Sequence, residues 1–333
     1  MEKILVSGGA GYIGSHAVKQ LVEEGYAVLV LDNLVYGHAE FVRGAELIVG
    51  DIGDVSLLDR IFTDHSIGSV MHFSAYAYVG ESITNPAKYY QNNLAATLTL
   101  LEGMRKVGIP HFIFSSTCAT YGNPLALPIT EEHPQNPINP YGASKFMVER
   151  ILKDYEVAYG LKSILFRYFN AAGADPSGEI GEWHDPETHL IPLVLDVAAG
   201  HRDSIRIFGT DYDTPDGTCI RDYIHVNDIA RAHILGLKHL QAKQPGEAFN
   251  LGNGSGFSVR EVIRAAEKLT GRTIRARETP RRPGDPPVLV GSAEKAARLL
   301  GWKTGFSSLE QILEMAWRWH RRFRQIANLP PNC

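Results

Sequence analysis

The feature that most constrains this chain is a glycine-rich turn near its start. It separates a short β-type segment at residues 3–7 from a helical segment at residues 15–24, and it is spaced by Gly8, Gly11 and Gly14. Glycines at such positions allow a tight turn, close approach of the backbone to a pyrophosphate, and close packing of the helix on the strand. The helix N-terminus adds N–H groups and partial positive charge. The turn therefore predicts a dinucleotide-binding α/β unit.

An acidic residue follows the next β-type segment, at residues 27–31. Asp32 comes eighteen residues after Gly14, close to the spacing of about 20 at which a carboxylate accepts ribose hydroxyls. The first glycine spacing is G-x-x-G rather than the commoner G-x-G, so an ordinary glycine-rich turn is the competing interpretation. Residues 33–36 contain no Lys or Arg to bind a 2′-phosphate. These features favour NAD over NADP.

Alternating strands and helices predict the fold class. Short buried strands are expected at residues 3–7, 27–31, 47–49, 69–73, 111–114 and 163–167, and a long helix at residues 86–107. Six strands with intervening helices predict a doubly wound parallel sheet of the Rossmann type. Ligands of such sheets bind beyond the carboxyl ends of the strands, where the strand order reverses.

A change of composition after about residue 175 predicts a second, smaller α/β domain. Helices are expected at residues 191–199, 259–269 and 309–324, and a strand at residues 205–208. We expect residues 1–175 to bind the dinucleotide and residues 176–333 to bind the substrate. A β-type run at residues 221–226 and the helix that follows it, to about residue 242, are expected to pack back onto the first domain.

A tyrosine and a lysine four residues apart are the strongest indication of chemistry. Asn139 is a suitable N-cap and Pro140 a suitable first residue, so a helix is predicted to begin there. The spacing then places the phenol of Tyr141 and the ammonium of Lys145 on one helical face. A nearby cation lowers the pKa of a phenol from about 10, which is too high for a base at neutral pH. A half-buried Tyr beside a solvated Lys is the competing interpretation.

A threonine at the end of a predicted strand completes a possible reaction centre. Thr117 follows two serines at the strand end where a nicotinamide would arrive. Its hydroxyl can share the reacting hydroxyl of a substrate with Tyr141. Together with Lys145, these residues form a set that interconverts an alcohol and a ketone by hydride transfer.

Composition excludes several other classes of function. The chain has 333 residues, 44% of them hydrophobic, which suffices for about two domains with real cores. The net charge is −4 and the basic residues are scattered, so we expect no nucleic-acid partner. No apolar run approaches the about 18 residues of a membrane span, and the first strand leaves no room for a signal peptide. With three cysteines at no framework spacing, the chain is expected to be cytoplasmic.

These motifs in combination resemble a known family. The turn GGAGYIG, the strand end at Thr117 and the helix start YGASK resemble the extended short-chain dehydrogenase/reductase superfamily. Within it, FSA at 73–75, VGES at 79–82, RYFN at 167–170, RDYIHV at 221–226 and RRPGD at 281–285 are similar to the UDP-glucose 4-epimerase family. The similarity extends over nearly the whole chain, to about residue 319.

The resemblance implies inversion at C4 of a UDP-hexose, which interconverts UDP-galactose and UDP-glucose. Because the C4–H is not acidic, hydride is removed to tightly bound NAD, and the resulting 4-ketose rotates and is reduced on its other face. In this scheme Tyr141 is the base, Lys145 holds the nicotinamide ribose and stabilises the phenolate, and Thr117 orients O4. Relatives are commonly homodimers through helices that correspond to residues 86–107 and 140–159.

The resemblance also implies which residues bind the two ligands. The NAD positions are Gly8, Gly11, Tyr12, Ile13, Gly14, Asp32, Asn33, Asp51, Ile52, Phe73, Asn92, Tyr141, Lys145 and Phe169. The UDP-sugar positions are Thr117, Asn170, Leu190, Phe208, Arg221, Arg282, Asp285 and Leu289. The two arginines suit a diphosphate because a guanidinium pairs bidentately with phosphate oxygens. Core packing and solvated surface charge are the competing interpretations of the individual residues.

Departures from the family pattern leave alternatives open. Leu289 is intermediate between the bulky Tyr of strict epimerases and the small residue of promiscuous ones, so a UDP-N-acetylhexosamine is an alternative substrate. A UDP-pentose is another, because relatives that act on UDP-pentoses share most of these motifs. Ala77 replaces a Lys that would contact the cofactor. A nucleotide-sugar dehydratase needs an acid and a base after Thr117, where this chain has Cys118 and Ala119. A net dehydrogenase and a non-catalytic NAD sensor are the remaining alternatives.

The segment at residues 184–189, HDPETH, is a further departure. His189 replaces an Asn of the family's uracil loop. Two histidines and two acids could indicate a metal site, but the intervening proline and the loop context favour a polar lid. We therefore expect no metal.

Overall fold

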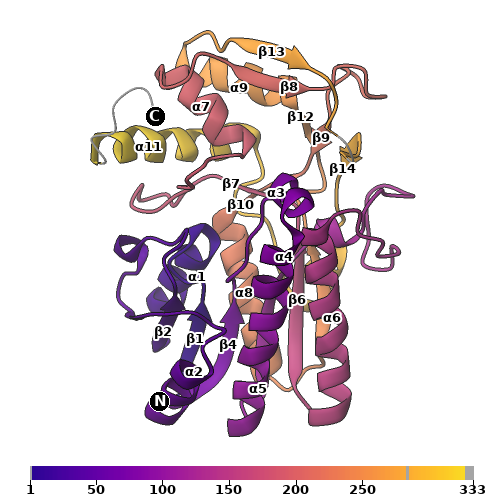
Figure 1. Cartoon of the computed structure of the whole chain (residues 1–333). Coiled ribbons are helices and arrows are strands. Elements are labelled where there is room, and N and C mark those ends of the chain that lie inside the picture. The colour runs from indigo at the N-terminus through magenta and orange to yellow at the C-terminus, as the bar shows by residue number, and fades with distance from the viewer. Residues whose placement is uncertain (1, 283–284, 327–333) are drawn as a thin grey trace.

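A seven-stranded parallel sheet lies at the centre of the larger of two regions in the computed structural model (Figure 1). The structure describes residues 2–282 and 285–326. The order of the strands in the sheet is β11-β6-β5-β4-β1-β2-β3. The strands are β1 (Lys3–Ser7), β2 (Val28–Asp32), β3 (Glu46–Val49), β4 (Ile67–His72), β5 (His111–Thr117), β6 (Lys162–Tyr168) and β11 (Glu247–Leu251). The chain adds strands outward in one direction from β1 and in the other from β4. The strand order therefore reverses between these two neighbours.

The predicted doubly wound sheet is confirmed, and it has one strand more than predicted. All six predicted strands are present, with small shifts at their ends. The seventh, β11, pairs with β6 in parallel, Phe249 opposite Phe166. Its short sequence EAFNL carries a weak strand signal, and pairing with a strand about 80 residues earlier fixes its conformation.

Two hydrophobic layers cover the faces of this sheet, because side chains alternate along each strand. Ile4 and Val6 of β1 pack under α1 (Tyr12–Glu23) and α8 (Val226–Gln241). Leu5 faces the other layer, formed with α2 (Val55–Asp64), α5 (Thr97–Val107) and α6 (Pro140–Tyr159). The helix of the 221–242 segment, α8, lies against α1.

The helix predicted at residues 86–107 is wrong as a single α-helix. It consists of α4 (Pro86–Tyr89), a π-helical segment η2 (Tyr90–Ala96) and α5. The side chain of Asn93 accepts a hydrogen bond from the Tyr76 N–H and donates one to the Tyr76 carbonyl, both at 2.9 Å. These bonds tie the wide turn to the loop that follows β4. Such turns frequently occur at functional sites, and Asn92 lies in this one.

A smaller region lies beyond the carboxyl edge of the sheet (Figure 1). It contains α7 (Leu190–Ala199), α9 (Val259–Thr270) and α11 (Leu309–Ile326), with β8 (Ile205–Phe208) parallel to β13 (Ala276–Thr279). The three predicted helices and the predicted strand are all present. Their core includes Ile191, Val262 and Leu313.

Short elements connect the two regions. The run predicted at residues 221–226 is divided between two strands, β9 (Ile220–Arg221) and β10 (Tyr223–His225). Strand β9 pairs with β12 (Phe257–Ser258) and β14 (Val288–Leu289). Strand β10 pairs with β7 (Asn170–Ala172). The remaining elements are η1 (Ala39–Phe41), α3 (Val79–Thr84), η3 (Cys118–Thr120) and α10 (Glu294–Leu300). Residues 283–284 of the predicted RRPGD motif and residues 327–333 lie outside the described part.

Candidate active site

The three glycines of the turn after β1 have different roles, because packing within the protein requires two of them and not the third. A Cβ on Gly8, which has φ +76°, would lie 2.4 Å from the backbone nitrogen of Ser74, and one on Gly14 would lie 2.1 Å from the Gly8 carbonyl oxygen. The packing of the protein itself therefore requires these two glycines. A Cβ on Gly11 would meet only the Gly8 oxygen, at an ordinary 3.5 Å. The surface of the turn at Gly11 is open, as expected where a ligand approaches the backbone.

The ends of β2 and β3 place carboxylates beside this turn. Asp32 is buried and accepts hydrogen bonds from the N–H groups of Ala10 and Leu34, both at 2.9 Å. Its burial raises the pKa of the carboxyl, while the two N–H groups oppose that rise. Asn33 donates to Asp51 at 2.9 Å. The structure thus brings three of the predicted NAD residues together, with acceptors that can bind ribose hydroxyls.

Tyr12, Ile13 and Ile52 have packing roles within the protein. The phenol of Tyr12 donates to the Gly173 carbonyl at 2.7 Å and ties the start of α1 to the chain beyond β7. Ile13 packs partly buried against the core, and Ile52 is buried. Core packing explains these side chains, and a backbone contact to a ligand is compatible with it.

Phe73, Asn92 and Phe169 lie near the same carboxyl edge. The ring of Phe73, directly after β4, has its centroid 4.6 Å from that of His233. The side-chain amide of Asn92 donates to Asn93 at 2.9 Å. Phe169 follows β6 and is buried with Tyr121. The positions agree with a nucleotide site, whereas the contacts of Phe169 also suit ordinary packing.

Three predicted catalytic residues converge where β5 ends. Helix α6 begins as predicted, with Asn139 accepting the N–H of Gly142 at 2.8 Å and Pro140 as its first residue. The buried ammonium of Lys145 donates to the Ser115 carbonyl at 2.8 Å. The hydroxyl of Thr117 lies close enough to Tyr141 to oppose a rise in the pKa of its phenol. The phenol, the hydroxyl and the ammonium therefore lie around one strand end.

Burial determines the protonation of this group of residues. It raises the pKa of Tyr141 to about 12, against the opposing hydrogen bond with Thr117. It lowers the pKa of Lys145 to about 7, against the opposing charge of Glu149. At neutral pH the phenol is therefore protonated and the amine is only partly charged. A phenolate here needs further positive charge, which the oxidised nicotinamide of NAD carries, so the residues fit that cofactor.

Two pairs of predicted substrate residues lie close together beyond the sheet. Arg221 is buried and forms an ion pair with Asp285, and Leu289 of β14 is aligned with Arg221 of β9. The guanidinium of Arg282 lies 4.0 Å from the centroid of the Phe208 ring. Both pairs offer groups that suit a nucleotide. Arg221 and Asp285 carry charges that can bind phosphate or ribose, and Arg282 and Phe208 form a flat stacked pair that suits a base.

Asn170 and Leu190 begin two further elements. Asn170 is the first residue of β7, and its N–H donates to the Asp222 carbonyl at 3.0 Å. Leu190 is the first residue of α7 and packs partly buried against the core of the smaller region. Asn170 thus lies two residues beyond β6 of the large sheet, and Leu190 belongs to the smaller region.

Comparison with known proteins decides the family. Residues 4–252 match the NAD dependent epimerase/dehydratase family. This chain belongs to that family. It is 53% identical over 318 residues to a UDP-glucose 4-epimerase of Halalkalibacterium halodurans, which covers 96% of this chain and 95% of the relative. The predicted resemblance to UDP-glucose 4-epimerases is thereby confirmed.

Solved structures agree with this family assignment. A UDP-glucose 4-epimerase from Brucella ovis in complex with NAD is 50% identical and has a TM-score of 0.93. The match covers 95% of this chain and 98% of the other chain. One from Bifidobacterium longum in complex with NAD+ and UDP is 40% identical, with a TM-score of 0.92 and coverage of 96% and 98%.

Sequence reasoning missed a buried polar network behind the candidate active site of this chain. Glu149 of α6 receives hydrogen bonds from Ser116 and from Arg167, whose terminal nitrogen lies 2.6 Å from the carboxylate. Arg167 also donates to the Tyr121 hydroxyl at 2.9 Å, and Tyr121 donates to Asn250 of β11 at 2.7 Å. Glu149 follows Lys145 by four residues, a spacing that could have indicated its inward face.

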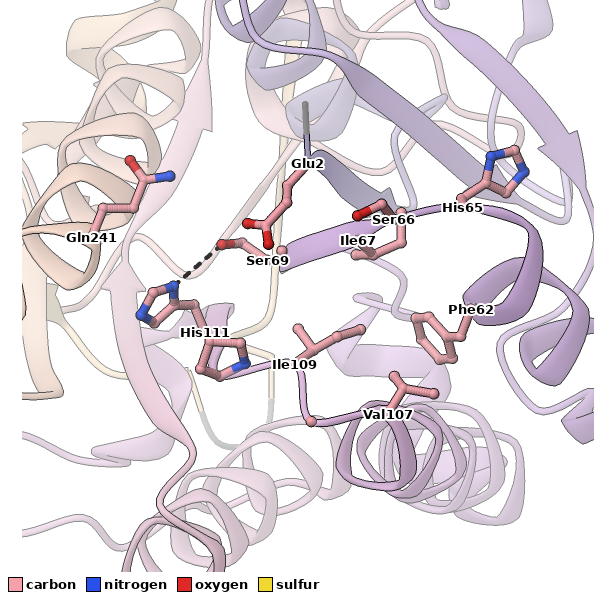
Figure 2. Close-up of a pocket in the computed structure, with 13 residues that line it drawn as sticks. Glu2, Phe62, His65, Ser66, Ile67, Ser69, Val107, Ile109, His111 and Gln241 are labelled. Atoms are coloured by element: carbon pink, nitrogen blue, oxygen red, sulfur yellow. Dashed lines mark hydrogen bonds between the residues drawn. The ribbon is translucent and has the colours of Figure 1, made fainter.

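A cavity of about 380 Å³ opens at the opposite edge of the sheet (Figure 2). Ile67, Ser69 and His111 line it at the amino ends of β4 and β5, and the Ser69 hydroxyl lies 3.4 Å from the His111 ring. None of the predicted site residues lines this cavity. Because parallel sheets bind ligands beyond their carboxyl ends, we assign it no role in the reaction.

Within residues 2–282 and 285–326, no helix combines the length and the apolar character that a membrane span requires.

Proposed function

We propose that this chain interconverts UDP-galactose and UDP-glucose by NAD-dependent oxidation and re-reduction at C4. The convergence of Thr117, Tyr141 and Lys145 at the end of β5 carries the proposal. Its relatives of nearly equal length, including the Halalkalibacterium halodurans protein, are UDP-glucose 4-epimerases. Dinucleotide binding alone does not need the phenol, so the complete set favours an enzyme over an NAD sensor.

The cofactor is assigned to the carboxyl edge of the sheet around β1, β2 and β4. The open surface at Gly11 faces the pyrophosphate, and Asp32, with Asn33 and Asp51 beside it, accepts the ribose hydroxyls. Lys145 holds the nicotinamide ribose. Bound NAD supplies a hydride acceptor and donor, and it remains on the protein through the cycle because loss of NADH would leave the 4-ketose without the hydride needed to reduce it.

The side chains of this chain perform the proton chemistry. Thr117 orients O4 of the sugar by a hydrogen bond, and Tyr141 accepts the O4 proton as the C4–H is removed. The sugar becomes a 4-ketose, which turns within the site while its nucleotide remains bound. Tyr141 then returns the proton to O4 when hydride reaches the other face. The ammonium of Lys145 stabilises the phenolate between these two events.

We assign the UDP portion to the smaller region, within residues 176–333, and NAD to residues 1–175. Arg221 and Arg282 bind the diphosphate, and Asp285 leaves its ion pair with Arg221 in part to accept the uridine ribose hydroxyls. The uracil lies along Leu190 and Phe208, and Asn170 donates to the diphosphate or sugar. The partner ligand is thus a nucleotide sugar held between both regions.

The deciding experiment uses UDP-galactose labelled with deuterium at C4 and no added reductant. We expect conversion to UDP-glucose with the label retained and without accumulation of NADH. Loss of the label to the solvent would exclude hydride transfer through a retained cofactor. Stoichiometric NADH would instead indicate a net dehydrogenase, and no reaction a binding protein.

Leu289 favours a second candidate substrate, a UDP-N-acetylhexosamine. Leu289 packs partly buried beside Tyr121, Ile129 and Phe169, and a leucine there leaves more space for a sugar substituent than the tyrosine of strict epimerases would. An assay of UDP-hexoses, UDP-N-acetylhexosamines and UDP-pentoses under identical conditions ranks the substrates.

We further propose a cytoplasmic homodimer. The free thiols of Cys118 and Cys219 suit a reducing compartment. Helix α6 exposes Met147, Val157 and Tyr159, of which Val157 is 90% exposed. Such apolar groups suit a helix interface between two copies. Light scattering of the full chain should give twice the chain mass, and Val157→Glu should lower that mass, whereas Leu125→Glu, on a loop, should leave it unchanged.

A further inference from the structure

Four side chains between β7 and α7 converge on one point. One nitrogen or oxygen from each of Glu182, His184, Glu187 and His189 lies within 4.8 Å of all the others. Nδ1 of His189 is 2.9 Å from a carboxylate oxygen of both Glu182 and Glu187. Nδ1 of His184 is 3.5 Å and 3.4 Å from oxygens of the same two carboxylates. The group is shielded, with Glu182 only 7% exposed.

Hydrogen bonding within the protein leaves this group incompletely satisfied. An imidazole nitrogen carries at most one proton, yet two carboxylate oxygens lie at equal distance from Nδ1 of His189. Nδ1 of His184 is inaccessible to solvent and makes no hydrogen bond among the described residues. Unpaired buried polar atoms beside two carboxylates are costly. A cation at the centre would satisfy all four side chains at once.

The distances suit a small four-coordinate ion. With nitrogen and oxygen ligands at about 2.1 Å, the edges of a tetrahedron around zinc are about 3.4 Å long. The four nitrogen–oxygen separations are 2.9, 2.9, 3.4 and 3.5 Å, with Oε1 of Glu187 beside His189 and Oε2 of the same carboxylate beside His184. Two carboxylates and two neutral imidazoles carry a charge of −2, which a divalent ion neutralises. Magnesium and calcium prefer oxygen ligands alone.

We propose that Glu182, His184, Glu187 and His189 form a structural zinc site. In the sequence, the intervening proline and the loop context of residues 184–189 favoured a polar lid over a metal. Glu182, the most shielded of the four ligands, lies outside that motif. Four protein ligands close the coordination shell, as in structural sites, and leave no open position for catalysis.

The location of the site indicates what the zinc ion does. The ring of His184 lies perpendicular to that of Tyr12 at the start of α1, 6.1 Å between centroids. The hydroxyl of Tyr78 donates to the carbonyl of Pro186 at 3.0 Å. His189 directly precedes the first residue of α7. The ion therefore fixes the connection between the glycine turn and the first helix of the smaller region.

Metal content of the full chain with its bound cofactor tests the proposal without any activity assay. Protein dialysed against EDTA and then equilibrated with zinc chloride should bind one zinc ion per chain, measured by inductively coupled plasma mass spectrometry. Magnesium chloride in place of zinc should give no bound metal. Substoichiometric zinc in the wild type would overturn the proposal and support an ion-paired group with protonated histidines.

Matched variants assign the ion to these ligands. Glu182→Gln preserves the size of the side chain and should weaken zinc affinity at least about 100-fold, since even indirect partners of a metal contribute about 10- to 100-fold. His65→Gln, beside Glu46 at 4.0 Å on another surface, is the control and should retain wild-type affinity. Glu187→Gln replaces Glu182→Gln if circular dichroism shows that the latter is unfolded. Wild-type zinc affinity in the folded glutamine variant would contradict the site.

Discussion

Burial shifts the pKa values of single active-site residues away from the values that proton transfer at neutral pH requires. Without further positive charge, the pKa of Tyr141 is raised to about 12 and that of Lys145 is lowered to about 7. A free phenolate would therefore be scarce at neutral pH. This arrangement ties the formation of a base to the presence of the positively charged nicotinamide ring of oxidised NAD, and it limits proton transfer by the protein without cofactor.

Replacement of Tyr141 tests its role as the base. Tyr141→Phe removes the hydroxyl but keeps the ring, so turnover should fall by about 10²- to 10⁴-fold, the usual contribution of a positioned acid–base group. Bound NAD, measured by chromatography after denaturation, should remain at the wild-type level. The control Tyr159→Phe lies on the same helix, is 57% exposed and should have no effect. A wild-type rate in Tyr141→Phe would refute the assignment.

Replacement of Leu289 tests the control of sugar size. Leu289→Tyr narrows the space beside Phe169 and Tyr121. It should reduce kcat/KM for UDP-N-acetylglucosamine at least about 10-fold more than for UDP-glucose, as expected for a pocket that loses room for a substituent. Leu289→Met preserves the volume and should leave the ratio unchanged. Equal losses for both substrates in Leu289→Tyr would reject this role.

At the scale of elements, the buried network joins α6 to three strands of the sheet. Ser116 of β5, Arg167 of β6 and, through Tyr121, Asn250 of β11 all connect to Glu149. Lys145 is one helical turn before Glu149, and Thr117 directly follows Ser116. The network therefore holds the catalytic helix and the catalytic strand end at a fixed separation.

Loss of Glu149 should be costly because it leaves the charge of Arg167 buried. Both side chains are at most 3% exposed, and breaking such a pair costs about 3–5 kcal/mol. Urea unfolding of Glu149→Gln should show a loss of this size. Asp154→Asn, which breaks an exposed pair with Arg150 on the same helix, should cost no more than about 0.5 kcal/mol. A loss for Glu149→Gln as small as that of the control would contradict the network.

Local signals in the sequence predicted most helices and strands. They failed where contacts between residues far apart in the chain determine the conformation. Gly11, Asn139 and Pro140 carry their structural meaning locally, so the glycine turn and the start of α6 could be predicted. The strand β11 depends on pairing with β6, and the π-helical turn depends on the bonds of Asn93 to Tyr76. The ion pair of Arg167 with Glu149 likewise joins separate elements, and no spacing rule for a single helix or strand identifies both partners.

At the scale of the whole molecule, buried histidines connect stability to pH. His16 of α1, His225 at the N-cap of α8 and His233 within α8 are all buried. Burial lowers the pKa of His16 and His233 to about 4 and that of His225 to about 3. In the unfolded chain each takes up a proton near its ordinary value of about 6.5. Their contribution to stability is present above about pH 6.5 and is lost as the pH falls toward 4.

Removal of one such histidine should flatten this dependence. A histidine whose pKa is about 6.5 in the unfolded chain and about 4 in the folded protein makes stability depend on pH. As the pH falls from 7.5 to 5, each such histidine lowers the free energy of unfolding by about 2 kcal/mol. In His233→Gln, urea unfolding at the two pH values should show a difference smaller than that of the wild type by this amount. An unchanged difference would show that His233 does not titrate between the folded and unfolded states in this range.

The late position of β11 in the chain has a consequence for synthesis on the ribosome. Its partner β6 is complete at Tyr168, but β11 ends only at Leu251, so β6 remains an open sheet edge while the intervening residues emerge. Open edges pair readily with other chains. The nascent protein thus passes through an interval in which α8 and the elements before it must shield β6 from neighbouring polypeptides.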